Sequence, residues 1–405
     1  MNRISRVFRP LICCLLPILA ACAPSPELPQ TMTPTDSPAT QSSIRVATYN
    51  AALNDNVAGG LIARLEAGDE NARRIAAVIQ RQRPDLLLIN EFDHDAGQRA
   101  ADLFQRRYLE VGQFGEQAIA YPFRYLAPVN TGVASGFDLD RDGRSDGPGD
   151  AWGFGTHPGQ YGMLVLSRFP IDAAAVRTFQ QFTWKDLPDA LAPVDPDTGE
   201  PWYPDAVWSL MPLSSKSHWD VPVDTPLGRL HFLVSHPTPP VFDGPEDRNG
   251  RRNHDEIRFW AEYVDDPDAA WLIDDAGRRG GLGRDARFVI AGDLNADPVD
   301  GDSVDSAVLQ VLEHPRVLRH TTPRSDGAAL AAERDGGANL RHQGSHDHDT
   351  GNFGPRVGNL RIDYVLPSVG LQVLDSGVFW PAPGQPGADW IDASDHRMVW
   401  LDLRP

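Results

Sequence analysis

The sequence contains little cysteine, little lysine and no long apolar run. All three cysteines of the 405 residues lie within the first 22 positions, so residues 23–405 cannot form a disulfide bond. Only Lys185 and Lys216 are lysines, and 37 basic against 56 acidic side chains give a formal charge of −19. The composition excludes a polytopic membrane protein. The negative charge argues against a protein that binds nucleic acid through a broad basic surface.

Residues 1–22 have the pattern of a secretion signal. Three arginines precede an apolar run from Leu11 to Leu19, which is too short for a comfortable membrane span. Cys22 directly follows Leu-Ala-Ala and resembles the acylated cysteine of bacterial lipoproteins; the alternative is an ordinary signal peptide that contains a cysteine. We therefore expect an exported protein that is either secreted or anchored to the bacterial envelope through a lipid on Cys22. Removal of this segment would take away three arginines and no acid and change the charge from −19 to −22.

The remaining sequence divides into a tether and one domain. Residues 23–43 are rich in Pro, Ser and Thr and have little to bury, which predicts a tether. Residues 44–405 contain short apolar runs typical of buried strands, and no linker separates them into two domains. The runs are Ile44–Tyr49, Leu86–Ile89, Met163–Leu166, Leu230–Val234, Phe288–Ala291, Ile362–Leu366 and Met398–Leu401.

Amphipathic stretches and irregular stretches lie between these runs. Helical spacing of apolar residues predicts helices at Asn71–Arg83, Asp255–Asp265 and Ser303–Glu313. Three stretches rich in Gly, Pro, Asp or Trp fit no regular element, namely 127–160, 183–226 and 320–359. The domain is therefore expected to be mixed α/β, with long loops of the kind that often carry function.

Polar side chains gather where the predicted strands end. They are Asn50, Glu91, His236, Asp293, Asn295, Asp363, Asp395 and His396. A sheet presents such side chains as a rigid site. Carboxylates, amides and imidazoles together suit a hard divalent cation that activates water against a phosphorus centre.

Seven short segments, in order along the chain, resemble the endonuclease/exonuclease/phosphatase (DNase I-like) superfamily. This group includes pancreatic-type DNases, apurinic endonucleases, bacterial sphingomyelinases and inositol polyphosphate phosphatases. The segments are Val46-Ala47-Thr48-Tyr49-Asn50, Ile89-Asn90-Glu91, Leu166-Ser167-Arg168-Phe169-Pro170, Val234-Ser235-His236, Gly292-Asp293-Leu294-Asn295, Arg361-Ile362-Asp363-Tyr364 and Ser394-Asp395-His396. The resemblance implies a four-layer α/β/β/α sandwich of two packed, mostly antiparallel sheets flanked by helices.

The resemblance also implies a metal site. Glu91 matches the principal ligand of Mg²⁺, or of Mn²⁺ in its place, and Asn50 would help to bind the metal or the scissile phosphate. Asp363 and Asp395 would belong to the same metal-binding cluster; for Asp363 a buried ion pair that supports the sheet is the alternative. In apurinic-type nucleases an acidic residue stands two places after the strand-one asparagine, whereas this chain has Ala52 there.

The catalytic roles follow from the same resemblance. Asp293 would orient or deprotonate the attacking water, and Asn295 would hold a phosphate oxygen. His396 would act as general base or transition-state stabiliser, and Asp395 would fix its tautomer and orientation. His236 matches the family histidine that donates to the phosphate or to the leaving oxygen.

Two further groups of residues are specific to this chain. An alternating series of aspartates follows the pattern of a calcium loop, with glycine at the sixth place; an acidic surface loop is the alternative. The candidate calcium ligands are Asp138, Asp140, Asp142 and Asp146, while Gly149 occupies the twelfth place and Asp150 follows it. Arg248 and Arg252, in the stretch after His236, are candidates for binding the substrate's phosphate; ion pairs at a helix start are the alternative.

These observations predict a Mg²⁺- or Mn²⁺-dependent hydrolase of phosphoester bonds that acts by direct attack of water outside the cytoplasm. No cysteine is available as a nucleophile after residue 22. The expected substrate is a small phosphate ester, a lipid head group or a nucleic acid, and no obligate protein partner is evident. The alternative is a calcium-dependent surface binding protein on an inactive version of the scaffold. Occupation of every expected catalytic position favours the enzyme.

Overall fold

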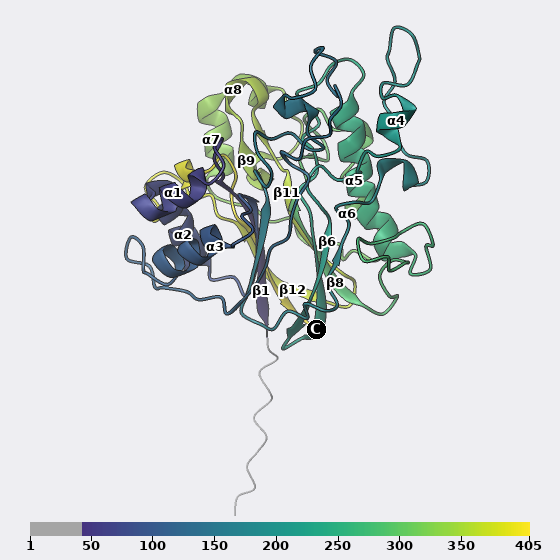
Figure 1. The fold of residues 1–405 in the computed structure, drawn as a ribbon. Coiled ribbons are helices and arrows are strands. Elements are labelled where there is room, and N and C mark those ends of the chain that lie inside the picture. Colours follow the sequence, from purple (N-terminus) through teal and green to yellow (C-terminus); the bar gives the residue numbers. More distant parts are fainter. Residues whose placement is uncertain (1–42) are drawn as a thin grey trace, which may run out of the picture. The chain divides into compact units, whose positions relative to one another are not determined.

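The computed structural model describes residues 43–405, and these contain two large sheets (Figure 1). The first sheet has six strands in the order β12-β13-β1-β2-β4-β3. Their bounds are β1 (Ile44–Leu53), β2 (Leu86–Phe92), β3 (Phe123–Tyr125), β4 (Met163–Ser167), β12 (Gln372–Val378) and β13 (Val399–Arg404). Only β1 and β2 pair in parallel; the other neighbours are antiparallel. The signal and tether predicted for residues 1–43 lie almost wholly outside the described residues.

The second sheet has five strands in the order β11-β8-β7-β6-β5. Their bounds are β5 (Arg177–Thr178), β6 (Trp219–Thr225), β7 (Gly228–Val234), β8 (Arg287–Asp293) and β11 (Asp363–Pro367). Here β7 and β8 pair in parallel and the other neighbours are antiparallel. A small ladder joins β9 (Gly351–Asn352) to β10 (Asn359–Leu360).

Helices cover the outer faces of the two sheets (Figure 1). On the side of the first sheet lie α1 (Gly60–Ala67), α2 (Glu70–Gln82) and α3 (Arg99–Phe104), the last continued by a π-helical turn at Gln105–Leu109. On the side of the second sheet lie α4 (Asp205–Trp208), α5 (Arg248–Asp265) and α6 (Leu309–Leu312). Two further helices are α7 (Ala328–Asp335) and α8 (Gly354–Val357). Short 3₁₀ turns are Pro148–Asp150, Trp184–Asp186, Val304–Ser306, Gly337–Leu340, His346–His348 and Ile391–Ala393.

Three apolar core layers separate the four structural layers. Between the two sheets, Val46 and Leu88 of the first sheet pack with Val221, Phe232 and Val289 of the second. A second cluster joins the first sheet to α1–α3, and a third joins the second sheet to α5 and α6. Both faces of the central strands are therefore buried, which explains their nearly continuous apolar runs. The predicted four-layer α/β/β/α sandwich is confirmed.

Helix α2 illustrates how local sequence sets an element. The Asp69 carboxylate caps the helix by accepting the Ala72 amide proton at 2.7 Å. Ile75 and Ile79 are fully buried against the first sheet. The helix ends before Arg83, which adopts a left-handed conformation directly ahead of Pro84. The helix predicted at Asn71–Arg83 is confirmed.

Three expectations about secondary structure are wrong. The stretch 183–226 contains strand β6, where Pro222 and two aspartates interrupt the apolar pattern although its alternate side chains fill the inter-sheet core. The stretch 320–359 also contains regular elements, namely α7, α8 and strand β9 of the small ladder. The helix predicted at Ser303–Glu313 is broken, since Asp305 and Ser306 adopt positive φ and only a short helix follows.

The described residues contain no helix that is both long and apolar enough to cross a membrane.

Candidate active site

The side chains that follow the strands converge where the two sheets meet. Asn50 of β1 is fully buried, and its amide nitrogen donates to Glu91 Oε1 at 3.1 Å and to Asp293 Oδ2 at 3.0 Å. Glu91 belongs to the first sheet and Asp293 to the second. One amide group therefore links carboxylates from both sheets.

Three residues of this region have a backbone conformation that side chains seldom adopt. Ala52, Glu91 and Asn295 have φ of 47°, 57° and 52°. Such conformations typically cost on the order of 1–3 kcal/mol each and cluster at functional sites. At Ala52 the β1–β2 register shifts between Asn50 and Leu53. Regular strand geometry is thus interrupted at the positions where the polar side chains of the site occur.

Asp293 is the centre of the polar cluster. Its side chain is 1% exposed, and Oδ2 lies 3.3 Å from His236 Nε2 and 3.6 Å from His396 Nε2. The other oxygen accepts the backbone amide proton of Asn295 at 2.9 Å. Burial raises the pKa of Asp293, but His396, His236 and the Asn50 amide together bring it well below its usual value. Asp293 is therefore a carboxylate at neutral pH.

His396 is oriented by Asp363, not by Asp395 as the sequence suggested. His396 Nδ1 lies 2.9 Å from Asp363 Oδ2, which also accepts the Thr350 hydroxyl proton at 2.8 Å. Asp395 directs its carboxylate outward: that side chain is 58% exposed and its nearest oxygen lies 3.9 Å from His396 Nε2. Asp395 lies at a bend of the chain, and its exposed carboxylate makes only this distant contact with His396.

The two carboxylates beside His396 keep its ring charged. Burial lowers the pKa of His396, but Asp363 and Asp293 outweigh burial and raise it to about 10. Burial raises the pKa of Asp363 to about 6, with His396 opposing the increase. At neutral pH the pair is therefore an imidazolium beside a carboxylate, an arrangement that can donate a proton but has no free site to accept one.

This charge predicts a pH-dependent stability. Because the folded-state pKa of His396 lies above its ordinary value of 6.5, its contribution is complete below pH 6.5 and disappears as the pH rises through about 10. The His396→Gln variant lacks this contribution. The difference in unfolding free energy between wild type and variant, measured by urea titration, should shrink by on the order of 1 kcal/mol or more between pH 7 and pH 10. A constant difference would contradict a charged His396.

His236 has the opposite electrostatic character. Burial and the positive charge of Lys216 lower its pKa, and Asp293 only partly offsets them. His236 is therefore neutral at pH 7. It follows Ser235, whose hydroxyl accepts the indole proton of Trp260 from helix α5 at 2.8 Å. Asn295 lies next to it, because its amide donates to the Pro237 carbonyl at 3.1 Å.

The side chain of Glu91 suits a divalent cation. Glu91 is half-buried, and its two oxygens accept protons only from the neutral amides of Asn50 and Asn54, at 3.1 and 2.9 Å. No basic side chain of residues 43–405 forms an ion pair with it. A carboxylate surrounded by amides at the edge of an acidic cluster is the oxygen donor set that Mg²⁺ prefers. Asn54 thus contacts Glu91, whereas Ala52, at the position that is acidic in apurinic-type nucleases, has no polar side chain.

The carboxylates of Asp293 and Asp363 and the His396 ring could also surround an ion, since their ligand atoms lie within 4.8 Å of one another. Both nitrogens of His396 are already directed at these carboxylates, and the ring is charged. A metal ligand must instead be a neutral imidazole. Without a cation the cluster forms an ion-paired imidazolium, and Glu91, which has no basic partner, is a further candidate ligand. The metal roles of Asn50, Asp363 and Asp395 stay predictions.

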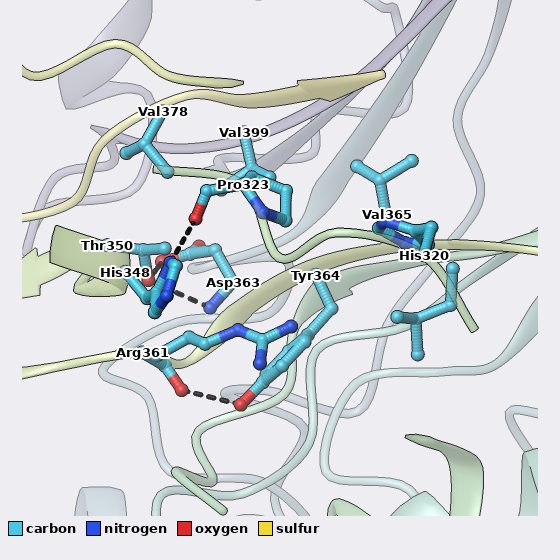
Figure 2. A pocket seen from close by; sticks show the side chains of 11 residues that line it. His320, Pro323, His348, Thr350, Arg361, Asp363, Tyr364, Val365, Val378 and Val399 are labelled. Carbon is cyan, nitrogen blue, oxygen red and sulfur yellow. Dashed lines mark hydrogen bonds between the residues drawn. The ribbon is translucent and has the colours of Figure 1, made fainter. Parts of the chain in front are cut away.

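A small cavity lies on the other side of Asp363 (Figure 2). Its volume is about 10 Å³, at the lower limit for one water molecule. His348, whose Nδ1 lies 2.9 Å from the Pro323 carbonyl, and Thr350 line it together with Arg361. The long stretch 320–359 thus packs directly against Asp363. The cavity is too small for a substrate.

The structure does not support the two arginines as phosphate ligands. Arg252 is 9% exposed, and its guanidinium donates to the carbonyls of Leu213, Pro212 and Trp152 at 2.8–2.9 Å. The guanidinium of Arg248 pairs with the buried carboxylate of Glu246. Arg248 forms an ion pair, as the alternative interpretation held, whereas Arg252 forms none and instead supports loops through three backbone carbonyls.

The aspartate loop gathers a different set of acids from the four expected. Carboxylate oxygens of Asp138, Asp140 and Asp150 lie within 4.8 Å of one another. Asp142 instead accepts the backbone amide proton of Arg144 at 2.8 Å, and Asp146 pairs with the Arg144 guanidinium at 2.9 Å. Asp142 and Asp146 are thus not brought together with the rest. Calcium binding by this loop stays a prediction.

Several residues that shape the site were missed from the sequence. Asn90, fully buried, accepts the Asp293 amide proton at 3.1 Å and donates to the Ser235 carbonyl at 3.3 Å, so it ties β2 to β8 and to the residue that follows β7. Its place directly before Glu91 was a usable signal. Thr350 lies in an irregular stretch where only the structure reveals its contact with Asp363.

Comparison with known proteins adds a family. The model of the Endonuclease/Exonuclease/phosphatase family matches residues 47–396. No curated protein matches the chain.

The chain is also similar to solved structures of low sequence identity. An endonuclease/exonuclease/phosphatase from Beutenbergia cavernae is 19% identical, with TM-score 0.49 over 89% of this chain and 71% of that one. A sphingomyelinase C from Streptomyces griseocarneus is 17% identical, with TM-score 0.46 over 89% of this chain and 99% of that one. A mannosyl-6-phosphatase from Bacteroides thetaiotaomicron is 13% identical, with TM-score 0.43 over 89% and 99%.

Proposed function

The chain belongs to the endonuclease/exonuclease/phosphatase family, and from this premise we propose that it is a metal-dependent hydrolase of phosphoester bonds. The observation that carries the proposal is the position of Asp293. This buried carboxylate contacts Asn50, His236 and Asn295 and lies beside the charged His396. The Asn50 amide donates to Asp293 and to Glu91, so it links the two carboxylates. A carboxylate fixed among donors of this kind is suited to orient a nucleophilic water.

The residues divide the chemistry of in-line attack on phosphorus. Asp293 accepts a hydrogen bond from the attacking water, orients it toward the phosphorus atom and takes its proton as the new P–O bond forms. The His396 imidazolium, held by Asp363, donates to oxygen atoms on which negative charge grows. His236, which is neutral, directs its single N–H at Asp293 and thereby holds that carboxylate in place. Mg²⁺ held at Glu91 would supply Lewis-acid stabilisation of the phosphate oxygens.

We further propose that the enzyme acts outside the cytoplasm. The pattern of residues 1–22 supports export, and Cys22 after Leu-Ala-Ala supports a lipid anchor. Residues 23–43 would then hold the catalytic domain at a distance from the membrane. Globomycin treatment of a bacterial host that expresses the full chain tests the anchor, because it should cause an uncleaved precursor to accumulate. A chain released by ordinary cleavage would show no such precursor.

A substrate panel tests the proposed activity. Purified protein is incubated with bis-p-nitrophenyl phosphate, p-nitrophenyl phosphate, plasmid DNA and sphingomyelin vesicles, each with Mg²⁺, with Ca²⁺ and with EDTA. We expect turnover of at least one substrate with Mg²⁺ and none with EDTA. Absence of turnover from every condition would contradict the proposal and favour the calcium-dependent binding protein.

A further inference from the structure

Lys216, one of the two lysines of the chain, lies beside the candidate active site. It comes three residues before β6, which pairs antiparallel with β7 through Trp219 and Val234. Continuing this register places Lys216 alongside the segment that begins at His236. Burial lowers the pKa of Lys216, while the carboxylates of Glu256, Glu91 and Asp293 oppose this decrease; the charge of Lys216 in turn lowers the pKa of His236.

A buried glutamate fixes the segment that carries Lys216. Glu256 of α5 is fully buried and accepts the Ser215 amide proton at 2.7 Å and the Thr238 amide proton at 2.6 Å. It therefore joins the residue before Lys216 to the loop that follows His236. A backbone fixed by a buried carboxylate holds a side chain in a defined direction.

The ammonium group of Lys216 has no partner within the fold. Lys216 as a whole is 6% exposed, and its Nζ forms no hydrogen bond or ion pair with residues 43–405. Nζ is not among the fully buried polar atoms that lack a partner, so the end of the side chain stays accessible. The carboxylates around it already have other donors: Glu256 binds two backbone amides, Glu91 binds two side-chain amides, and Asp293 binds Asn50 and His236. Three N–H donors of Lys216 thus remain available to a ligand.

We propose that the ammonium group of Lys216 binds the phosphate group of the substrate. The inference rests on the proposed function, because it requires a phosphate beside Glu91 and Asp293. The carboxylates of Glu91, Asp293 and Asp363 would repel that anion, and Mg²⁺ at Glu91 together with the His396 imidazolium would offset them. Lys216, in its protonated form, adds N–H donors that can bind the phosphate oxygens directly, which neutral His236 does not. Lys216 is therefore a substrate-binding residue.

Binding of inorganic phosphate tests this role without depending on turnover. Calorimetric titration in the presence of Mg²⁺ compares wild type with Lys216→Met, which keeps the apolar stem, with Lys216→Arg, and with Lys185→Met as control. Lys185 is the other lysine and is exposed. We expect Lys216→Met to bind phosphate about tenfold or more weakly, Lys216→Arg to recover part of the loss, and Lys185→Met to match wild type. Equal affinity in folded Lys216→Met would overturn the proposal.

A second measurement covers the case in which Lys216→Met does not fold. Wild-type protein is acetylated with and without phosphate, and the extent of reaction at each lysine is measured by mass spectrometry. Phosphate should protect Lys216 at least about threefold and leave Lys185 unchanged. Equal acetylation of Lys216 with and without phosphate would overturn the assignment. Failure of the substrate panel with phosphate protection intact would instead reject only the proposed hydrolysis.

Discussion

Asp293→Asn is expected to reduce hydrolysis of the best substrate of the panel by at least about 10³-fold, while KM changes little. The amide has the shape of the carboxylate but cannot accept a proton from water. It also removes the negative charge that lies 3.3 Å from His236 and 3.6 Å from His396. The measurement is kcat and KM of purified protein with Mg²⁺ at pH 7.5.

The matched control is Asp285→Asn, since Asp285 is an exposed aspartate that precedes β8 at the end opposite Asp293. It should retain wild-type kinetics. Far-UV circular dichroism and gel filtration establish that both variants are folded, because loss of a buried charge also lowers stability. Activity of folded Asp293→Asn within about tenfold of wild type would reject the mechanism.

Glu91→Gln is expected to abolish both hydrolysis and the response to Mg²⁺. The substitution keeps the hydrogen-bonding shape but removes the charge that binds the cation. Wild type should gain thermal stability as Mg²⁺ is added, because an ion that binds only the folded state stabilises it. The variant should show no such gain at the same concentrations, and its kcat with Mg²⁺ should fall by at least about 10³-fold.

The control for this prediction is Glu313→Gln, at an exposed glutamate after α6. It should melt and respond to Mg²⁺ like wild type. A Glu91→Gln protein that still gains stability from Mg²⁺ would place the metal elsewhere. In that event the cluster of Asp293, Asp363 and His396 becomes the candidate, and titration of Asp363→Asn would test it.

Much of the scaffold follows from the sequence because its central strands are buried on both faces. Such strands read as uninterrupted apolar runs, and all seven predicted runs match strands of the two sheets. The convergence of the polar residues that follow these runs was also predicted correctly, because the position of a strand in its sheet fixes the position of the residues at its end. Asn50, Glu91 and Asp293 illustrate this directly.

Pairing of side chains across the fold could not be predicted in this way. Asp395 was chosen as the partner of His396 because the two are adjacent in sequence, whereas the true partner, Asp363, lies 33 positions away on β11. Arg252 was chosen as an anion ligand because of its position near His236 in the sequence. Its hydrogen bonds to three backbone carbonyls have no sequence signature and are seen only in the structure. Lys216 likewise was not a candidate from the sequence, because its relation to the site depends on which groups surround its ammonium group in the fold.

The bridging amide of Asn50 means that neither sheet holds a complete active site. The first sheet supplies Asn50 and Glu91, and the second supplies Asp293 and Asp363, so their spacing is set by the thickness of the apolar layer between the sheets. A slip of one sheet against the other by about 1 Å would leave every strand intact yet break the alignment that attack on phosphorus requires. Enzymatic activity should therefore disappear before secondary structure does during partial denaturation, which makes catalysis a sensitive gauge of how the two halves fit together.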